Sequence, residues 1–85
     1  MSNVDIRAAV IKAIKASLAL DDNYIVQDEQ QLCDNLGADS LDIRVIGLDI
    51  EDSCGIDISD SDLYGVKTVG QLVDLAVRLH GEVQS

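Results

Sequence analysis

The sequence has 85 residues, 47% of them apolar, which suits one small domain around a single hydrophobic core. A net charge of −10 disfavours binding to nucleic acids and anionic membranes and favours basic protein surfaces. No apolar run approaches transmembrane length, and no Cys/His set has the spacing of a zinc site. We expect one acidic domain over residues 1–85, ordered from about 4 to 81, without a metal, a nucleic-acid partner or stable membrane insertion.

The N-terminal segment and the cysteines favour a cytoplasmic location. Charged residues such as Asp5, Arg7 and Lys12 interrupt the first apolar residues, unlike a signal peptide. Cys33 and Cys54 are too few for a disulfide framework, so we expect both to be buried free thiols.

The first predicted helix is capped by Asn3 and runs to about Leu20. Its surface is distinctive, because residues 1–20 carry three bases against one acid, whereas residues 21–65 carry thirteen acids against one base. A long connection over residues 21–39 follows, and connections of that length are often functional. Its apolar residues are expected to hold it to the core; these are Ile25, Val26, Leu32 and Leu36.

The second predicted helix runs from about Ser40 to Ser53, and Gly55 follows as its C′ residue. Asp39 is a good N-cap, and Asp42 stands three positions later as in a capping box. Two apolar stripes run along this helix, so one of them either is buried or faces a partner. The stripes are Ile43, Ile46, Ile50 and Cys54, and Leu41, Val45 and Leu48.

Two further helices complete the predicted fold. A short one covers about 60–64, and a longer one follows Thr68, which pairs with Gln71 as a capping box. We expect Gly81 to end the last helix and His80 to cap or decorate its C-terminus. The sequence therefore predicts an all-α bundle of three main helices plus one short helix, with a long loop between the first and second helices.

Ser40 is the strongest candidate for chemistry. At a helix N-terminus the backbone N–H groups are unpaired and the helix dipole is positive, which suits an attached phosphate, and Gly37 lets the chain bend just before it. A catalytic serine needs a positioned base, but the only histidine is His80, far along the chain. We therefore predict that the protein is not an enzyme and that another enzyme modifies Ser40.

The run Leu36-Gly37-Ala38-Asp39-Ser40-Leu41-Asp42 resembles the attachment motif of acyl carrier proteins. The chain from about Val4 to Gly81 is also similar to that family in length, charge and order of helices. The resemblance implies that a phosphopantetheinyl transferase transfers 4′-phosphopantetheine from coenzyme A to Ser40, next to Gly37, Asp39 and Leu41. Acyl groups would then be carried as thioesters for a fatty-acid, lipid or polyketide-like pathway.

The same resemblance implies a docking surface and an acyl pocket. The helix after Ser40 would bind acyl-loading and acyl-using enzymes through their basic surfaces, and a carrier that keeps this helix free is expected to be a monomer. The expected docking residues are Asp42, Arg44, Val45, Leu48, Asp49, Glu51 and Asp52. The expected pocket residues are Ile14, Ile46, Ile50, Ile58, Leu63, Val66 and Leu72.

Several residues depart from the pattern of carriers in primary fatty-acid synthesis. Val45 stands where those carriers usually have glutamate, and Arg44 where they usually have a small apolar residue. We therefore predict a specialised pathway and not the housekeeping one. Gly47 and Cys54 remove side-chain volume from the second helix, which suggests a roomier or more deformable acyl pocket.

Other functions fit the same residues. An aminoacyl or peptidyl carrier would use the same arm with polar cargo, although such carriers are usually less acidic. An unmodified interaction module would keep the fold, bind partners through its acidic face and function with Ser40→Ala. A loosely bound divalent cation on the acidic face is also compatible with the sequence.

Overall fold

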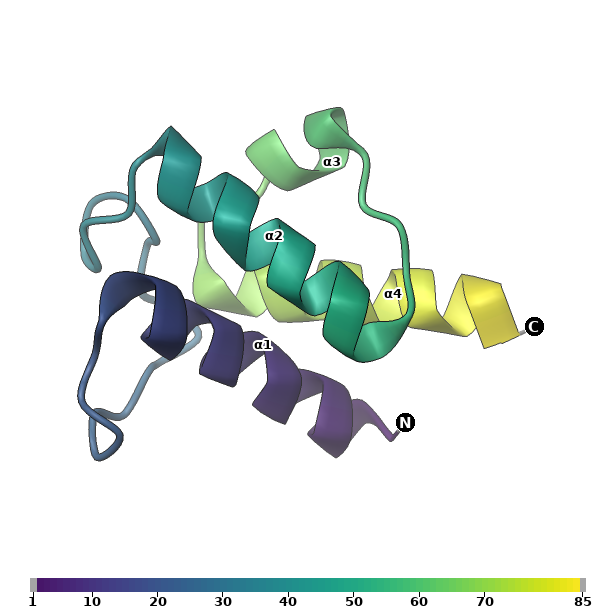
Figure 1. The fold of residues 1–85 in the computed structure, drawn as a ribbon, viewed down its shortest axis with the longest axis horizontal. Coiled ribbons are helices and arrows are strands. Elements are labelled where there is room, and N and C mark those ends of the chain that lie inside the picture. The colour runs from purple at the N-terminus through teal and green to yellow at the C-terminus, as the bar shows by residue number, and fades with distance from the viewer. Residues whose placement is uncertain (1, 85) are drawn as a thin grey trace.

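In a computed structural model, which describes residues 2–84, the chain folds into four α-helices. They are α1 (Asn3–Leu18), α2 (Ser40–Cys54), α3 (Asp60–Tyr64) and α4 (Val69–Gln84). Helix α1 packs against α2 and α4, and the short α3 packs against α2. Figure 1 shows α1 running opposite to α2 and α4, so that α1 begins on the side where α4 ends. The predicted all-α bundle of three main helices plus one short helix is confirmed.

The core is built from aliphatic side chains that the helices present at three- and four-residue spacing. Each fully buried Leu, Ile or Val side chain of this kind stabilises the fold by about 1.5–3 kcal/mol. Seven of the eight largest fully buried side chains come from α1, α2 and α4, and the eighth comes from the loop between α1 and α2. They are Ile6, Val10, Ile14, Leu32, Ile46, Ile50, Val69 and Leu72.

Helix α1 begins and ends differently from the prediction. Ser2, not Asn3, is the N-cap: its hydroxyl accepts from Asp5 N and its own N–H donates to the Asp5 carboxylate. The helix stops at Leu18 because Ala19 turns into the left-handed region with φ 53°. That turn lets Leu20 pack against the core.

Helix α4 has the predicted start but a different end. Gln71 N donates to Thr68 Oγ1 at 3.2 Å, and Thr68 N donates to Gln71 Oε1 at 3.1 Å, which confirms the capping box. The prediction that Gly81 closes the helix is wrong, because its φ is not positive and the helix continues to Gln84. His80 is buried instead of decorating an exposed end, because it continues the i, i+4 stripe of buried Leu72 and Ala76.

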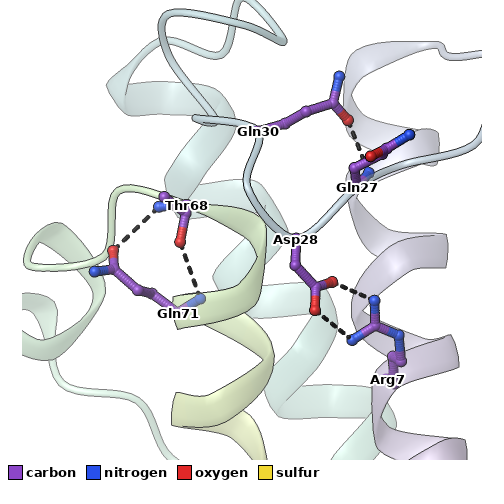
Figure 2. Close-up of polar contacts among 6 residues, drawn as sticks. All are labelled: Arg7, Gln27, Asp28, Gln30, Thr68 and Gln71. Atoms are coloured by element: carbon purple, nitrogen blue, oxygen red, sulfur yellow. Dashed lines mark hydrogen bonds and ion pairs between the residues drawn. The ribbon is translucent and has the colours of Figure 1, made fainter.

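Hydrogen bonds and one ion pair hold the long loop between α1 and α2 to the bundle. Arg7 on α1 forms a bidentate ion pair with Asp28, as Figure 2 shows, and the Asp28 carbonyl accepts from Gly70 N at 2.9 Å. The hydrogen bond to Asp28 and its negative charge raise the pKa of Arg7. Leu32 N donates to the Lys67 carbonyl at 2.9 Å. The loop is therefore attached at both α1 and the start of α4.

The predicted apolar anchors of this loop are correct except for one. Val26 and Leu32 are buried and Leu36 is half-buried, whereas Ile25 is 78% exposed. The prediction for Ile25 is wrong because neighbouring residues of an extended segment point to opposite sides, and Val26 takes the inward side.

Candidate functional site

The chain reaches α2 through a tight turn that the core holds in place. Gly37 adopts φ 76°, a left-handed conformation that favours glycine, and its N–H donates to the Cys33 carbonyl at 3.2 Å. The next residue, Ala38, is buried and donates to the Leu32 carbonyl at 2.9 Å. Because this turn is fixed on both sides, the residues that follow it enter α2 with a defined direction.

A reciprocal capping box begins α2, as predicted. Asp42 N donates to Asp39 Oδ1 at 2.9 Å, and Asp39 N donates to Asp42 Oδ2 at 3.2 Å. These bonds satisfy the N–H groups of Asp39, the N-cap, and of Asp42, the third residue of the helix. Among the described residues, the N–H groups of Ser40 and Leu41 have no hydrogen-bond partner. The structure thus brings together all four residues expected around the attachment site, Gly37, Asp39, Ser40 and Leu41.

This arrangement fits a phosphate ester on Ser40. Ser40 is exposed, and the neighbouring Leu41 is 67% exposed, so a modifying enzyme has access to both. Unpaired N–H groups and the positive end of the dipole of α2 favour an anion there. The candidate base His80 lies buried in α4, so among the described residues no imidazole is placed to activate the serine.

The predicted docking residues divide into two groups. Asp42 and Glu51 are half-buried and have structural roles: Asp42 caps α2, and Glu51 Oε2 accepts from Ile58 N at 2.8 Å. No local pattern in the sequence signals this second contact. The other five are exposed along α2: Arg44, Val45, Leu48, Asp49 and Asp52. With Leu41 they give α2 an apolar stripe bordered by charges.

The predicted pocket residues form part of the packed core. Ile14, Ile46, Ile50, Leu63 and Leu72 are buried, and Ile58 and Val66 are half-buried against them. A cavity of about 40 Å³ lies where α2 meets α3, lined in part by Gly47, Ile58 and Leu63. The cavity is small, and the side chains around it are packed in the core.

The first alternative predicted for Gly47, a roomier pocket, is wrong. A Cβ at Gly47 would lie 2.8 Å from Leu63 Cδ2, so the Leu63 side chain already fills that space. Leu63 of α3 therefore packs directly against Gly47 of α2, and only the small cavity described above lies beside them.

The two thiols lie in different surroundings. Cys54 is buried, and its burial raises the pKa of the thiol, whereas Cys33 is exposed. The prediction of two buried thiols is therefore wrong for Cys33, because its neighbour Leu32 takes the inward position in the loop.

Neither a metal site nor a membrane-spanning helix is present in the part of the chain that the structure describes. Within residues 2–84, no three His, Cys, Asp or Glu side chains are grouped so as to hold a metal ion. None of the helices in that part of the chain is long and apolar enough to cross a bilayer.

Comparisons with known proteins agree with this geometry. Residues 6–76 match the family described as "Phosphopantetheine attachment site". An acyl carrier protein of Thermotoga maritima is 36% identical over 72 residues, which cover 85% of this chain and 88% of that protein. The solved structure of a candidate acyl carrier protein from Mycobacterium tuberculosis superimposes with a TM-score of 0.76 at 31% identity, covering 86% of this chain and 97% of that one. The chain therefore belongs to the acyl carrier protein family, whose members carry a covalent phosphopantetheine group and are not catalysts.

Proposed function

We propose that Ser40 is the residue that carries 4′-phosphopantetheine. The observation that supports this most directly is its position at the first residue of α2, with its own N–H and that of Leu41 unpaired among the described residues. Ser2 and Ser59 also lie at helix starts, but their hydroxyls act as caps. The Ser2 hydroxyl accepts a hydrogen bond from Asp5 N, and the Ser59 hydroxyl accepts one from Asp62 N. The Ser40 hydroxyl has no such bond to a described residue and is exposed.

The residues around Ser40 bind and orient the group. The two free N–H groups and the helix dipole stabilise a phosphate by about 0.3–1 kcal/mol at an exposed site. Gly37 and the Asp39–Asp42 capping box fix the direction in which the arm leaves the protein. The thiol of the bound arm supplies the chemistry by holding acyl groups as thioesters.

We propose that the exposed face of α2 docks the enzymes that load and use the acyl group, including the phosphopantetheinyl transferase. Asp49 and Asp52 attract basic surfaces, while Arg44 repels them close to Ser40. Val45 adds an apolar contact, being 40% exposed. Because this face differs in charge from that of carriers in primary fatty-acid synthesis, we assign the protein to a specialised lipid or polyketide-like pathway.

We further propose that the acyl chain enters between α2 and α3. The seven predicted pocket residues would line it after Leu63 moves away from Gly47, since the cavity already present there is small.

The unpaired thiols of Cys33 and Cys54 suit the cytoplasm, where such groups stay reduced. A single domain acting as a monomer keeps α2 free for successive partners.

Intact-mass spectrometry tests the assignment of Ser40. The protein is incubated with coenzyme A and a broad-specificity phosphopantetheinyl transferase, beside the variants Ser40→Ala and Ser53→Ala. We expect one phosphopantetheine on the wild type and on Ser53→Ala, whose serine is also exposed on α2, and none on Ser40→Ala. Modification of Ser40→Ala, or no modification of the folded wild type, would contradict the assignment.

Complementation tests the proposed pathway. In a strain that lacks its housekeeping carrier, we expect the wild type to fail and Arg44→Ala/Val45→Glu to restore growth in part, since that variant regains the acidic docking face. Efficient growth with the wild type would contradict a specialised role.

A further inference from the structure

An open groove of about 780 Å³ runs along the outer face of α1. The core face of this helix carries Ile6, Val10 and Ile14, and the groove lies on the opposite side of the helix. Its lining includes Val4, Ala8, Ile11, Lys12 and Lys15, which recur at the three- and four-residue spacing of a helix face. The groove is therefore separate from Ser40 and from the exposed face of α2.

The floor of the groove is formed by apolar residues, most of which have short side chains. Val4 is 76% exposed, Ile11 is half-buried, and Ala8, Ala16 and Ala19 present only methyl groups. Short side chains allow a second helix to approach α1 closely, because the distance between packed helices depends on the side chains at the contact. Helix α1 has 16 residues and is about 24 Å long, so an occupying helix of similar length would cover the groove.

The edge of the groove is basic. Neither the ammonium of Lys12 nor that of Lys15 pairs with a carboxylate among the described residues; Lys15 Nζ donates to the Asp22 carbonyl at 2.9 Å. Arg7 also lines the groove but is paired with Asp28. The lining also includes one acidic residue, Asp22, at the end of the groove, so the two lysines leave the edge with an excess of positive charge. An apolar floor beside this excess complements an amphipathic helix that carries acidic residues beside its apolar stripe.

We propose that this groove docks an acidic amphipathic helix of a partner protein. Enzymes that dock on α2 need basic surfaces, and like charge would keep those surfaces away from Lys12 and Lys15. The two faces of the carrier therefore select partners of opposite charge, which leaves α2 and Ser40 accessible while the groove is occupied. The proposal does not depend on the modification of Ser40.

Titration of the ¹⁵N-labelled protein with a synthetic helical peptide tests this surface. The probe has leucines at i, i+4, i+7 and i+11 flanked by glutamates, and the control peptide keeps the leucines but replaces each glutamate with lysine. We expect saturable amide shift changes confined to the groove residues of α1 with the glutamate peptide. With the lysine peptide we expect none in the groove, because its charge suits the exposed acidic face of α2 instead.

Two charge-reversal variants show whether peptide binding depends on a groove lysine or only on the net charge of the protein. Lys12→Glu should weaken binding of the glutamate peptide roughly tenfold, because it places like charges together. Lys67→Glu makes the same change in net charge at an exposed residue before α4 and should alter affinity less than about twofold. Circular dichroism confirms that both variants fold, and modification of Ser40 by the transferase should be unchanged in both.

Four results would overturn the proposal. The first is shift changes centred on α2 with the glutamate peptide, and the second is no saturable change anywhere. Another is equal weakening by Lys12→Glu and Lys67→Glu, which would indicate only a response to net charge. The last is concentration-dependent shifts in the groove without peptide, which would make a second copy of the chain the occupant.

Discussion

The Leu63 side chain of α3 occupies the space that any side chain at Gly47 of α2 would need, with Leu63 Cδ2 2.8 Å from the position of a Cβ. Gly47 is buried in the middle of α2, where glycine costs about 1 kcal/mol relative to alanine. The close contact offsets this cost, because it lets the short α3 cover the core beside α2. The contact also closes the route by which we propose that an acyl chain enters.

We predict that Gly47→Ala has different effects on stability in two backgrounds. In the wild type the new methyl group clashes with Leu63, and this overpacking of about 1–3 kcal/mol outweighs or cancels the gain in helix propensity of about 1 kcal/mol. Where Leu63→Ala has already removed the clash, Gly47→Ala should raise the free energy of unfolding by about 1 kcal/mol. Urea denaturation of the four proteins of this double-mutant cycle measures both effects. Identical effects of Gly47→Ala in the two backgrounds would show that Leu63 is not the limiting contact.

Two glycines of α4 should respond to alanine in opposite directions. Gly81 lies inside the helix with nothing within 4 Å of an added Cβ, so Gly81→Ala should stabilise the protein by about 0.5–1 kcal/mol. At Gly70 an added Cβ would lie 3.3 Å from the Asp28 carbonyl oxygen, which accepts from Gly70 N. Gly70→Ala should therefore destabilise the protein and loosen the loop. Thermal unfolding measures the stabilities, and faster amide exchange of Leu32 would report the loosened loop. Destabilisation by Gly81→Ala would contradict the open space around that residue.

The capping box at the start of α2 predicts a graded response at Asp39. Asp39→Ala removes the oxygen that accepts from Asp42 N and should lower the free energy of unfolding by about 0.5–2 kcal/mol. Asp39→Asn keeps an oxygen in that place, and its loss should be much smaller because asparagine is as good an N-cap as aspartate. Denaturant unfolding of both variants checks this, and equal losses would mean that the charge of Asp39 matters more than its hydrogen bond.

The two thiols should differ in reactivity. At pH 7.5 Cys33 should react readily with iodoacetamide, because it is exposed. Cys54 should react slowly, because burial restricts access and raises the pKa of its thiol, which leaves less of the reactive thiolate. The variants Cys33→Ser and Cys54→Ser isolate each reaction in the unmodified protein. Similar rates for both thiols in the folded protein would contradict the placement of Cys54.

The features that could be predicted from the sequence depend on residues close together in it. The capping boxes Asp39–Asp42 and Thr68–Gln71 and the C-terminal turn at Gly55 are local, and the structure has all three. For the same reason the surroundings of Ser40 could be expected from a short motif.

Two kinds of feature could not be predicted from the sequence. Some depend on contacts between residues far apart in the chain, and others on which of two equally suitable neighbours takes a given role. Leu63 fills the space at Gly47, and Asp28 pairs with Arg7, across separations that no local pattern reports. Ser2 and Asn3 are both good caps, so sequence alone did not identify the N-cap of α1. The groove on α1 corresponds to a pattern in the sequence, because bases alternate with small apolar residues on the outer face of this helix. The same pattern is also typical of an ordinary solvent-exposed helix.

Tandem mass spectrometry of the protein isolated from its natural host would locate the residue that carries phosphopantetheine. Trypsin cleaves after Lys15 and Arg44, so one peptide over residues 16–44 contains Ser17 and Ser40, and its fragment ions distinguish them. We expect this peptide to carry phosphopantetheine on Ser40, with its thiol free or acylated as a thioester. Phosphopantetheine on another residue, or a functional protein in which Ser40 is always unmodified, would contradict it.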